Sequence, residues 1–407
     1  NSRKDAGGRL MNNHRIYMDN CVTTPVAPEV LEVMKPYFLE KFWFPGTFIS
    51  TGEETNAAIA QFKEIIAKAL NASPEEIHFT SGGTLANNIA LKGLIGANAN
   101  KGRHIIVSLV DYPDLLTNAA YFEKQGFEVT YLEPDSEGWI SADKLKEAIR
   151  PDTILFMSTV VNHVVGTIQP MADYKKVIET ADHKIFWHLD AGQAFGKMHL
   201  DVQDLGVDTL SVSAHKIHGP QGIGALFVKK GTKLSQLIHG VTRVDQLQTG
   251  GISIALIAGF AKAVEMTFSD LDANISYLRE LSNYLLEKLE STIPDIELNG
   301  PRGDKRVCHN INVSISYIEG ESITMMLDLN GVTVATGSAC ASQGLKPNYV
   351  LMAMGKNHIQ SHGSMKFTLS RYNTKEEIDY TVEKLAEITS TLRERSPLYQ
   401  AIHNKER

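Results

Sequence analysis

The sequence predicts an α/β protein in which a large domain with a mostly parallel sheet precedes a smaller α+β domain. Through the middle of the chain, short apolar segments alternate with helical patterns, as in layered α/β folds. Several apolar segments are continuously apolar, which is typical of strands buried on both faces of a parallel sheet. A length of 407 residues is also more than one compact core usually holds, so we expect two domains.

The elements of the large domain follow in order from this alternation. The predicted strands are Glu76–Thr80, His104–Leu109, Glu128–Leu132, Thr153–Thr159, Lys184–Leu189, Thr209–Ser213 and Gly224–Val228. The predicted helices are Thr55–Leu70, Ala86–Leu94, Leu115–Gln125, Ala142–Ile149 and Met171–Ala181.

The pattern changes after about Ile252. A long helical stretch, Ala255–Ile293 with a break near Asp270, precedes mixed elements at Val307–Ser314, Ser322–Asn330, Met365–Leu369 and Lys375–Glu394. We therefore expect a disordered leader over residues 1–16, a large domain over 17–265 and a small C-terminal domain over 266–407. The N-terminal segment is expected to pack on the small domain.

The composition disfavours several classes of protein. A net charge of −7 argues against a nucleic-acid or anionic-membrane partner, since both require a basic surface. No apolar stretch approaches the roughly 20 residues that span a bilayer. Three scattered cysteines do not form a disulfide framework, and no zinc-type pairing with histidine occurs, so we expect a cytoplasmic protein without a metal site.

Two segments bring a lysine and an acid to the ends of predicted strands. Lys216 follows the strand Thr209–Ser213, among small and polar residues, and a buried lysine is a good Schiff-base nucleophile. Asp190 ends an apolar segment 26 residues earlier, and ligands of open α/β sheets bind at the carboxyl ends of strands. Pyridoxal phosphate needs such an acid against its pyridine nitrogen.

A third segment, Thr80–Asn88, has the order of strand, glycine-rich turn and helix start. Backbone N–H groups and the helix dipole at such a turn suit a phosphate. Any one of the three segments alone is a weak signal, but together and in this order they indicate a pyridoxal-phosphate enzyme with the cofactor on Lys216.

From Tyr17 to Tyr399 the chain resembles the class V aminotransferase superfamily, and within it the NifS/IscS-type cysteine desulfurases. The resemblance rests on the opening Tyr17–Pro25, on Asp190 with Gln193, and on the Ser-x-His-Lys-x-x-Gly-Pro motif at Ser213–Pro220. It implies the pyridoxal-phosphate-dependent transferase fold of type I and a homodimer.

The resemblance also implies roles for individual residues. Asp190 would face the pyridine nitrogen and Gln193 the phenolic oxygen. The phosphate would be held by Gly83, Thr84, Ser213 and His215, and the substrate would be bound by Asn20, Asn162 and Arg371, with Asn162 also near the ring oxygen.

Cys340 lies in Thr336–Ser342, which resembles the active-site loop of the desulfurases. The resemblance implies that its thiolate takes the sulfur of L-cysteine as a persulfide and leaves alanine. A short loop before Val350 resembles the IscS-type rather than the SufS-type group. Cys21 and Cys308 lack such a context, and we interpret both as structural.

Two departures from the family lie at the expected cofactor site. Tyr112 stands where the family has a histidine that stacks on the ring and helps proton transfer; a tyrosine can stack, but its pKa of about 10 makes it a poor base at neutral pH. His163 is a weaker candidate for that proton transfer. The family's Arg-x-Gly-Thr motif reads Gln248–Gly251 here, so Thr249 is the candidate for contact with the neighbouring subunit's phosphate.

Three functions remain open on the sequence. The leading one is a cysteine desulfurase that passes sulfur to an acceptor protein, such as an iron–sulfur scaffold, a tRNA-thiolation protein or a biosynthetic partner. The second is a carbon–sulfur or selenocysteine lyase, or a transaminase, without persulfide chemistry. The third is a scaffold without cofactor, which the intact Asp190, Gln193, His215 and Lys216 disfavour.

Overall fold

The computed structural model of the chain describes residues 15–241, 246–336 and 347–403. Its central sheet has seven strands in the order β2-β8-β7-β6-β5-β3-β4. The strands are β2 Ile77–Thr80, β3 His104–Ser108, β4 Glu128–Leu132, β5 Thr153–Thr159, β6 Phe186–Asp190, β7 Thr209–Ser213 and β8 Gly224–Val228. Only β8 runs against its neighbours, so the sheet is mostly parallel.

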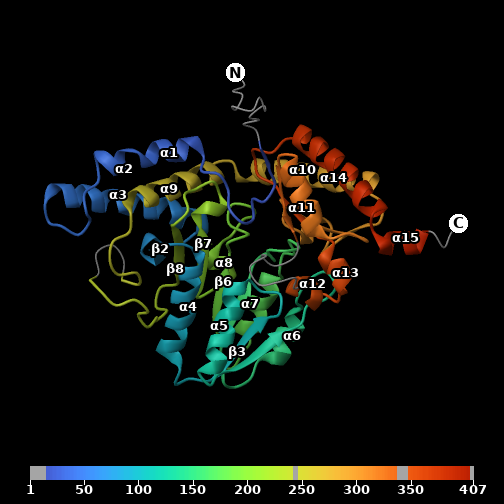
Figure 1. Cartoon of the computed structure of the whole chain (residues 1–407). Helices are drawn as coiled ribbons and strands as arrows, with labels where there is room; N and C mark the ends of the chain where they lie inside the picture. The colour runs from blue at the N-terminus through green and yellow to red at the C-terminus, as the bar shows by residue number, and fades with distance from the viewer. Residues whose placement is uncertain (1–14, 242–245, 337–346, 404–407) are drawn as a thin grey trace.

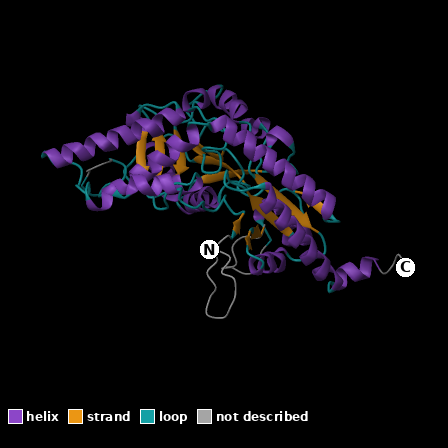
Figure 2. Cartoon of the chain, turned by 90° about the horizontal axis from the view of Figure 1, so that it is seen from above, coloured by secondary structure: helices purple, strands orange, loops and turns teal. Residues whose placement is uncertain are grey.

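Helices cover both faces of this sheet (Figures 1 and 2). Alternate residues of β3 point to opposite faces of the sheet. Ile105 and Val107 pack with α4 (Gly83–Asn98) and α5 (Pro113–Lys124), whereas Ile106 packs in the layer on the other face. That layer includes residues of α6 (Ala142–Ala148) and α7 (Met171–Glu179), and the short α8 (Val202–Leu205) packs on α7. This two-sided burial explains the continuously apolar strands.

An extended N-terminal arm lies beside the long helix α9 (Ile254–Phe268). It consists of α1 (Pro28–Met34), α2 (Pro36–Leu39) and α3 (Ser50–Leu70), and both α1 and α3 pack on α9. Figure 1 shows the segment between α2 and α3 at the outer edge of the molecule, beyond the central sheet.

The C-terminal part contains a second, antiparallel sheet in the order β12-β13-β10-β9. Its strands are β9 Ile296–Leu298, β10 Asn310–Ile315, β12 Ala335–Thr336 and β13 Ser364–Thr368. Its helices are α10 Leu271–Thr292, α11 Gly320–Leu329, α12 Tyr349–Ala353, α13 His358–His362, α14 Lys375–Glu394 and α15 Pro397–His403. Close to the start of the chain, β1 (Ile16–Tyr17) pairs in parallel with β11 (Val332–Thr333).

The predicted α/β class and the order of elements are confirmed. Four strands of the large sheet, β4, β5, β7 and β8, have the predicted bounds, and the long helical stretch breaks at Ser269 and Asp270. The division into domains at residues 265 and 266 stays a prediction. Within the described residues, no helix has both the length and the apolar character that crossing a bilayer requires.

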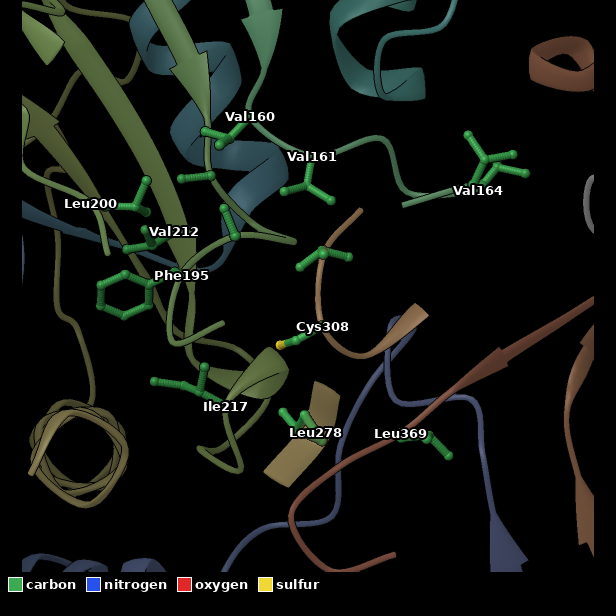
Figure 3. Close-up of a cluster of buried hydrophobic side chains, with 14 of the residues drawn as sticks. Val160, Val161, Val164, Phe195, Leu200, Val212, Ile217, Leu278, Cys308 and Leu369 are labelled. Carbon is green, nitrogen blue, oxygen red and sulfur yellow. The ribbon is translucent and has the colours of Figure 1, made fainter. Parts of the chain in front are cut away.

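A shared hydrophobic cluster connects the large sheet with the C-terminal part. Val160, Val212 and Phe195 belong to the large-sheet half, and Leu278 and Leu369 belong to the C-terminal half of the same cluster. Figure 3 shows these side chains converging around Cys308. The continuous core fixes the ends of β5, β6 and β7 against the C-terminal elements.

Candidate active site

A cavity of about 630 Å³ opens where the parallel strands end. Its lining includes the last residues of β6 and β7, the start of α4, the segment after β3 and residues 19, 21 and 22, which follow β1. Of the predicted cofactor residues, it brings together Gly83, Thr84, Tyr112, Asp190, Gln193, Ser213, His215 and Lys216. The strand-end position is the usual ligand site of an open α/β sheet.

Lys216 ends the short 3-10 turn that follows β7. Its Nζ donates to the backbone oxygens of Cys21 and Val22, the latter at 2.9 Å. Burial lowers the pKa of Lys216, while the thiol of Cys21 and the carboxylate of Asp190 oppose that shift. An amine that loses its proton more readily is a better nucleophile toward a carbonyl.

Asp190 is the last residue of β6 and is fixed by two hydrogen bonds. It accepts from the Gly192 N–H and from Asn87 Nδ2, each at 2.8 Å. Burial raises the pKa of Asp190, and these two donors oppose the shift. Such an acid can share a proton with a ring nitrogen.

Asn87 is a positioning residue that the sequence prediction missed. Its Oδ1 accepts from Ser211 Oγ at 2.6 Å and lies 3.0 Å from His188 Nε2. With both sides of the amide engaged, the Nδ2 group is held toward Asp190. The signal available was its position within Thr80–Asn88, one helical turn after Gly83.

The start of α4 forms a cradle for an anion. Gly82 has φ +146°, which favours glycine, and the Gly83 N–H donates to Ser213 Oγ at 3.0 Å. A Cβ at residue 83 would lie 2.7 Å from that oxygen. Free N–H groups of a long helix, with a hydroxyl and an imidazole beside them, suit a phosphate.

Together these groups fit pyridoxal phosphate. A buried amine at Lys216, a half-buried acid at Asp190 and the anion cradle at Gly83 share one cavity. Gln193 also lines it, and its Nε2 donates to the Cys21 oxygen at 3.0 Å. Burial, together with the charge of Lys216, lowers the pKa of His215 to about 4, and a bound phosphate would favour its protonated form.

Tyr112 lines the cavity just before α5, in edge-to-face contact with His163 at 5.0 Å between ring centroids. The preceding Asp111 anchors this position by accepting from the Ser108 N–H and from the N–H and Oγ1 of Thr159. Burial raises the pKa of Asp111 to about 7, and these donors oppose the shift. The ring of Tyr112 is therefore placed by a fixed turn.

His163 also lines the cavity, and its tautomer follows from its neighbour. Tyr349 Oη donates its one hydrogen to the Asp111 backbone oxygen at 2.6 Å. The same Tyr349 Oη lies 3.3 Å from His163 Nε2, and it can only accept there, so Nε2 carries the proton. His163 Nδ1 is then a bare acceptor, with no partner in the described part of the chain. Burial lowers the pKa of His163 to about 3, so the ring is neutral.

Lys366 and Asp19 line the cavity and were not predicted as site residues. Lys366 lies on β13, whose residues are otherwise apolar or small and polar, and its side chain is buried. Burial raises the pKa of Asp19, and the positive charge of Lys366 opposes that shift. The signal available in the sequence was a lysine within a short strand of otherwise apolar or small polar residues, where a charged side chain is uncommon.

Four predicted residues lie outside this lining. Arg371 and Asn20 line a smaller cavity, which shares only Lys216 with the main one. Asn162 is buried and holds its own loop: Nδ2 donates to the Val110 oxygen, and Oδ1 accepts from the N–H groups of Val164 and Val165. Thr249 Oγ1 donates to the Ile238 oxygen at 3.3 Å.

The three cysteines differ in position. Cys340 falls within residues 337–346, outside the described residues. Cys308 is a buried free thiol, in keeping with a structural role, whereas the buried Cys21 also lines the main cavity. The described residues contain no cluster of potential metal ligands.

Comparison with known proteins gives a consistent result. The family described as Aminotransferase class-V matches residues 16–381. A "Cysteine desulfurase IscS" of Dictyoglomus turgidum is 45% identical over 95% of this chain and 97% of its own length. A solved "NIFS-LIKE PROTEIN" has a TM-score of 0.88 at 32% identity over 93% of this chain and all of that one. A structure titled "SspA in complex with cysteine" has a TM-score of 0.77 at 34% identity over 88% of this chain and all of that one.

Proposed function

Because the chain belongs to the class V aminotransferase family and is a cysteine desulfurase, we propose that it uses pyridoxal phosphate on Lys216 to move sulfur from L-cysteine to Cys340. The observation that carries this proposal is the shared cavity of Lys216, Asp190 and the Gly83 turn. No other feature of the described residues unites an amine, an acid and a phosphate cradle.

Pyridoxal phosphate supplies a reactive carbonyl and an electron-accepting ring when it is bound. Lys216 would hold it covalently, and the acid of Asp190 would keep its ring nitrogen protonated. Gln193 would bond its phenolic oxygen, and Gly83, Thr84, Ser213 and His215 would surround its phosphate. Tyr112 would stack on its ring.

Residues around the substrate are suited to moving its proton, binding its carboxylate and orienting it. Lys216, when its amine is free, is the group placed to move the proton on the α-carbon of cysteine, since its pKa is lowered by burial. Two cations near Lys216 are candidates for the substrate carboxylate: Arg371, which the family resemblance assigns to it and whose Nε and Nη2 have no partner among the described residues, and Lys366, which lines the main cavity. The neutral His163, with Nδ1 as acceptor, is suited to orient a donor of the substrate and not to act as a strong base.

The sulfur transfer itself balances without an oxidant. The carbon–sulfur bond of cysteine breaks, a sulfur–sulfur bond forms on Cys340, and the carbon takes a proton to give alanine. Cys340 gains the sulfur and its hydrogen as a persulfide. The protein that then accepts this sulfur is one of the classes considered above, and the cytoplasm is the compartment we propose.

A direct test replaces Cys340 by serine. We expect the variant to keep its cofactor absorbance and to lose both alanine formation and the mass increase of one sulfur on that residue. Cys308→Ser is the matched control, because that thiol is buried away from the main cavity. Alanine release at the normal rate from the Cys340 variant, or pyruvate with free sulfide from the unmodified enzyme, would contradict the proposal.

We also propose that the functional form is a homodimer formed through the N-terminal arm. The arm and the chain beside it expose many large apolar side chains: Leu31, Phe38, Leu39, Phe42, Trp43, Phe44, Phe48 and Ile49. Phe48 is 95% exposed and Leu39 is 82% exposed. A concentration of exposed apolar side chains, rich in phenylalanine and tryptophan, is typical of an interface between chains. Thr249 does not line the main cavity of its own chain, so in a dimer it could contact the phosphate in the main cavity of the neighbouring chain.

Sedimentation of arm variants tests the dimer. Leu39→Asp with Phe48→Asp is expected to halve the mass of the particle, because two charges would be buried in an apolar contact. Leu329→Asp is the matched control, since Leu329 is 85% exposed on α11, outside the arm. A dimer that survives the arm variant as well as the control would exclude this surface.

A further inference from the structure

A row of polar side chains lies on one face of the large sheet, beside α4 (Figure 1). Alternate residues of a strand share a face, so His188 and Asp190 lie on the same face of β6. The register of the parallel strands pairs His188 with Thr209 and Asp190 with Ser211 of β7. Helix α4 adds Asn87, which contacts residues of both strands. The row ends at the acid of the main cavity.

These side chains form one continuous hydrogen-bonded chain. Asn87 Nδ2 lies 2.8 Å from Asp190 Oδ2, and Asn87 Oδ1 lies 2.6 Å from Ser211 Oγ and 3.0 Å from His188 Nε2. His188 Nδ1 lies 2.9 Å from Thr209 Oγ1. The four residues beyond Asp190 are buried, so their polar atoms depend on one another for partners.

The chain can be polarised in two ways, and the charge of Asp190 distinguishes them. A charged carboxylate only accepts, so Asn87 must present Nδ2 to it and Oδ1 to His188. An amide oxygen also only accepts, so His188 must then donate from Nε2. A protonated Asp190 would instead donate to Asn87 Oδ1, and the proton of the imidazole would move to Nδ1. Burial lowers the pKa of His188 to about 3, so the ring is neutral and holds a single proton.

We propose that His188 and Ser211 are positioning residues that keep Asp190 ionised opposite the ring nitrogen of the cofactor. Both donate to Asn87 Oδ1 and so turn the amide nitrogen toward the carboxylate. Burial raises the pKa of Asp190, whereas the donors Asn87 and Gly192 lower it. An ionised Asp190 keeps the ring nitrogen protonated, which makes the ring a better electron acceptor. This role rests on the proposed function, because it requires pyridoxal phosphate at Asp190.

The position of the proton on His188 is the first test. Nitrogen NMR of the holoenzyme, labelled in its histidines, should show His188 with a protonated Nε2 and a bare Nδ1. The signals of His188 are identified by their loss in His188→Gln. A proton on Nδ1, or on both nitrogens, would mean that Asn87 Oδ1 does not orient this ring, and would overturn the proposal.

Removal of the two donors is the second test. His188→Leu combined with Ser211→Ala leaves Asn87 Oδ1 without a donor, so the ring proton of isotope-labelled pyridoxal phosphate should shift toward Asp190, as nitrogen NMR of the cofactor measures. The kcat should fall by roughly 5- to 150-fold, the range that one unsatisfied buried group corresponds to. The KM should change little, because the ring accepts electrons mainly in the transition state. His188→Gln keeps a donor and should recover most of both signals. If the double variant does not fold, Ser211→Ala alone should shift the ring nitrogen signal less, in the same direction.

His104→Leu is the matched control. His104 is also a buried histidine of the large sheet, with its ring nitrogens 2.7 Å from Thr153 Oγ1 and 2.8 Å from Thr130 Oγ1, but it does not line the main cavity. The control should leave the ring nitrogen signal unchanged. An unchanged signal in the double variant, or an equal change in the control, would overturn the proposal while the cofactor remains bound. A chain that takes up no pyridoxal phosphate would refute the proposed function and this role with it.

Discussion

Lys366 is a buried cation that the sequence did not single out and that we propose as a candidate for binding the substrate. Its ammonium lies in the main cavity with Asp19 nearby and with Lys216 in the same lining. If the proposal holds, the carboxylate of an amino-acid substrate lies at this place. A lysine ammonium binds a carboxylate as a point charge, whereas an arginine guanidinium binds it with two donors in one plane.

Replacing Lys366 by alanine should raise the KM for L-cysteine. A hydrogen bond to a charged group contributes about 1.5–3 kcal/mol, which corresponds to an increase of roughly 10- to 150-fold. Lys366→Arg should recover most of the affinity, because it keeps the charge. Steady-state kinetics with Arg371→Ala as the comparison would decide between the two cations, since a larger KM effect at Arg371 would return the carboxylate to the residue first predicted.

At the residue scale, the structure gathers the predicted cofactor groups in one cavity more completely than the predicted substrate groups. Asp190 ends a buried strand, and Lys216 and Gly83 each follow one, so the strand order alone brings them to one edge of the sheet. Arg371 comes after β13, and Lys366 lies within it. Which of the two enters the cavity depends on side-chain direction and on packing against β10 and β12, and a motif does not contain that information.

At the element scale, the turn between β2 and α4 joins the sheet to the cofactor. Gly83 lies against Ser213 at the end of β7, so the helix start and a distant strand share one contact. A Cβ at residue 83 would lie 2.7 Å from Ser213 Oγ, so that hydroxyl or the start of α4 would have to shift.

Gly83→Ala should weaken the binding of pyridoxal phosphate by displacing the start of α4 from Ser213. Fluorescence titration of the apoprotein with the cofactor measures this loss. The double variant with Ser213→Ala removes the clashing oxygen, so the two substitutions should lose less than the sum of the single effects. Additive losses would mean that the contact between helix and strand does not govern the cradle.

The sequence also predicted elements unequally. The bounds of β4, β5, β7 and β8 were predicted because apolar runs are bounded by polar or glycine-containing turns. Helix α3 begins at Ser50, five residues before the predicted Thr55, because its first turns are polar and lack the apolar period. The pairing of β1 with β11 involves two-residue strands far apart in the chain, for which no local pattern exists.

At the scale of the whole molecule, one buried arginine connects the C-terminal part with the large sheet. Arg306 donates to the backbone oxygens of Asn299 and Pro301, each at 2.6 Å, and to that of Val165 at 3.0 Å. Val165 belongs to the loop after β5, so these hydrogen bonds span both halves of the shared core.

Arg306→Met should lower the free energy of unfolding by an amount on the order of 3 kcal/mol, because several buried carbonyl groups would lose their donors. Chemical denaturation measures this change. Arg302→Met is the matched control, since Arg302 is exposed and paired only at the surface, and it should change the stability by no more than about 0.5 kcal/mol. Equal effects of the two substitutions would show that the bridge does not stabilise the fold.

The pairing of Ile16–Tyr17 with Val332–Thr333 has a consequence during synthesis. The partners are separated by 316 residues, from 16 to 332. At about 5–20 residues per second, a ribosome needs roughly 16–60 s to make the second strand after the first. During that interval Cys21 and Val22 have no anchored strand before them, so the nascent large domain cannot complete the wall that holds the Lys216 amine. Cofactor capture should therefore come after residues 332–333 have been synthesised.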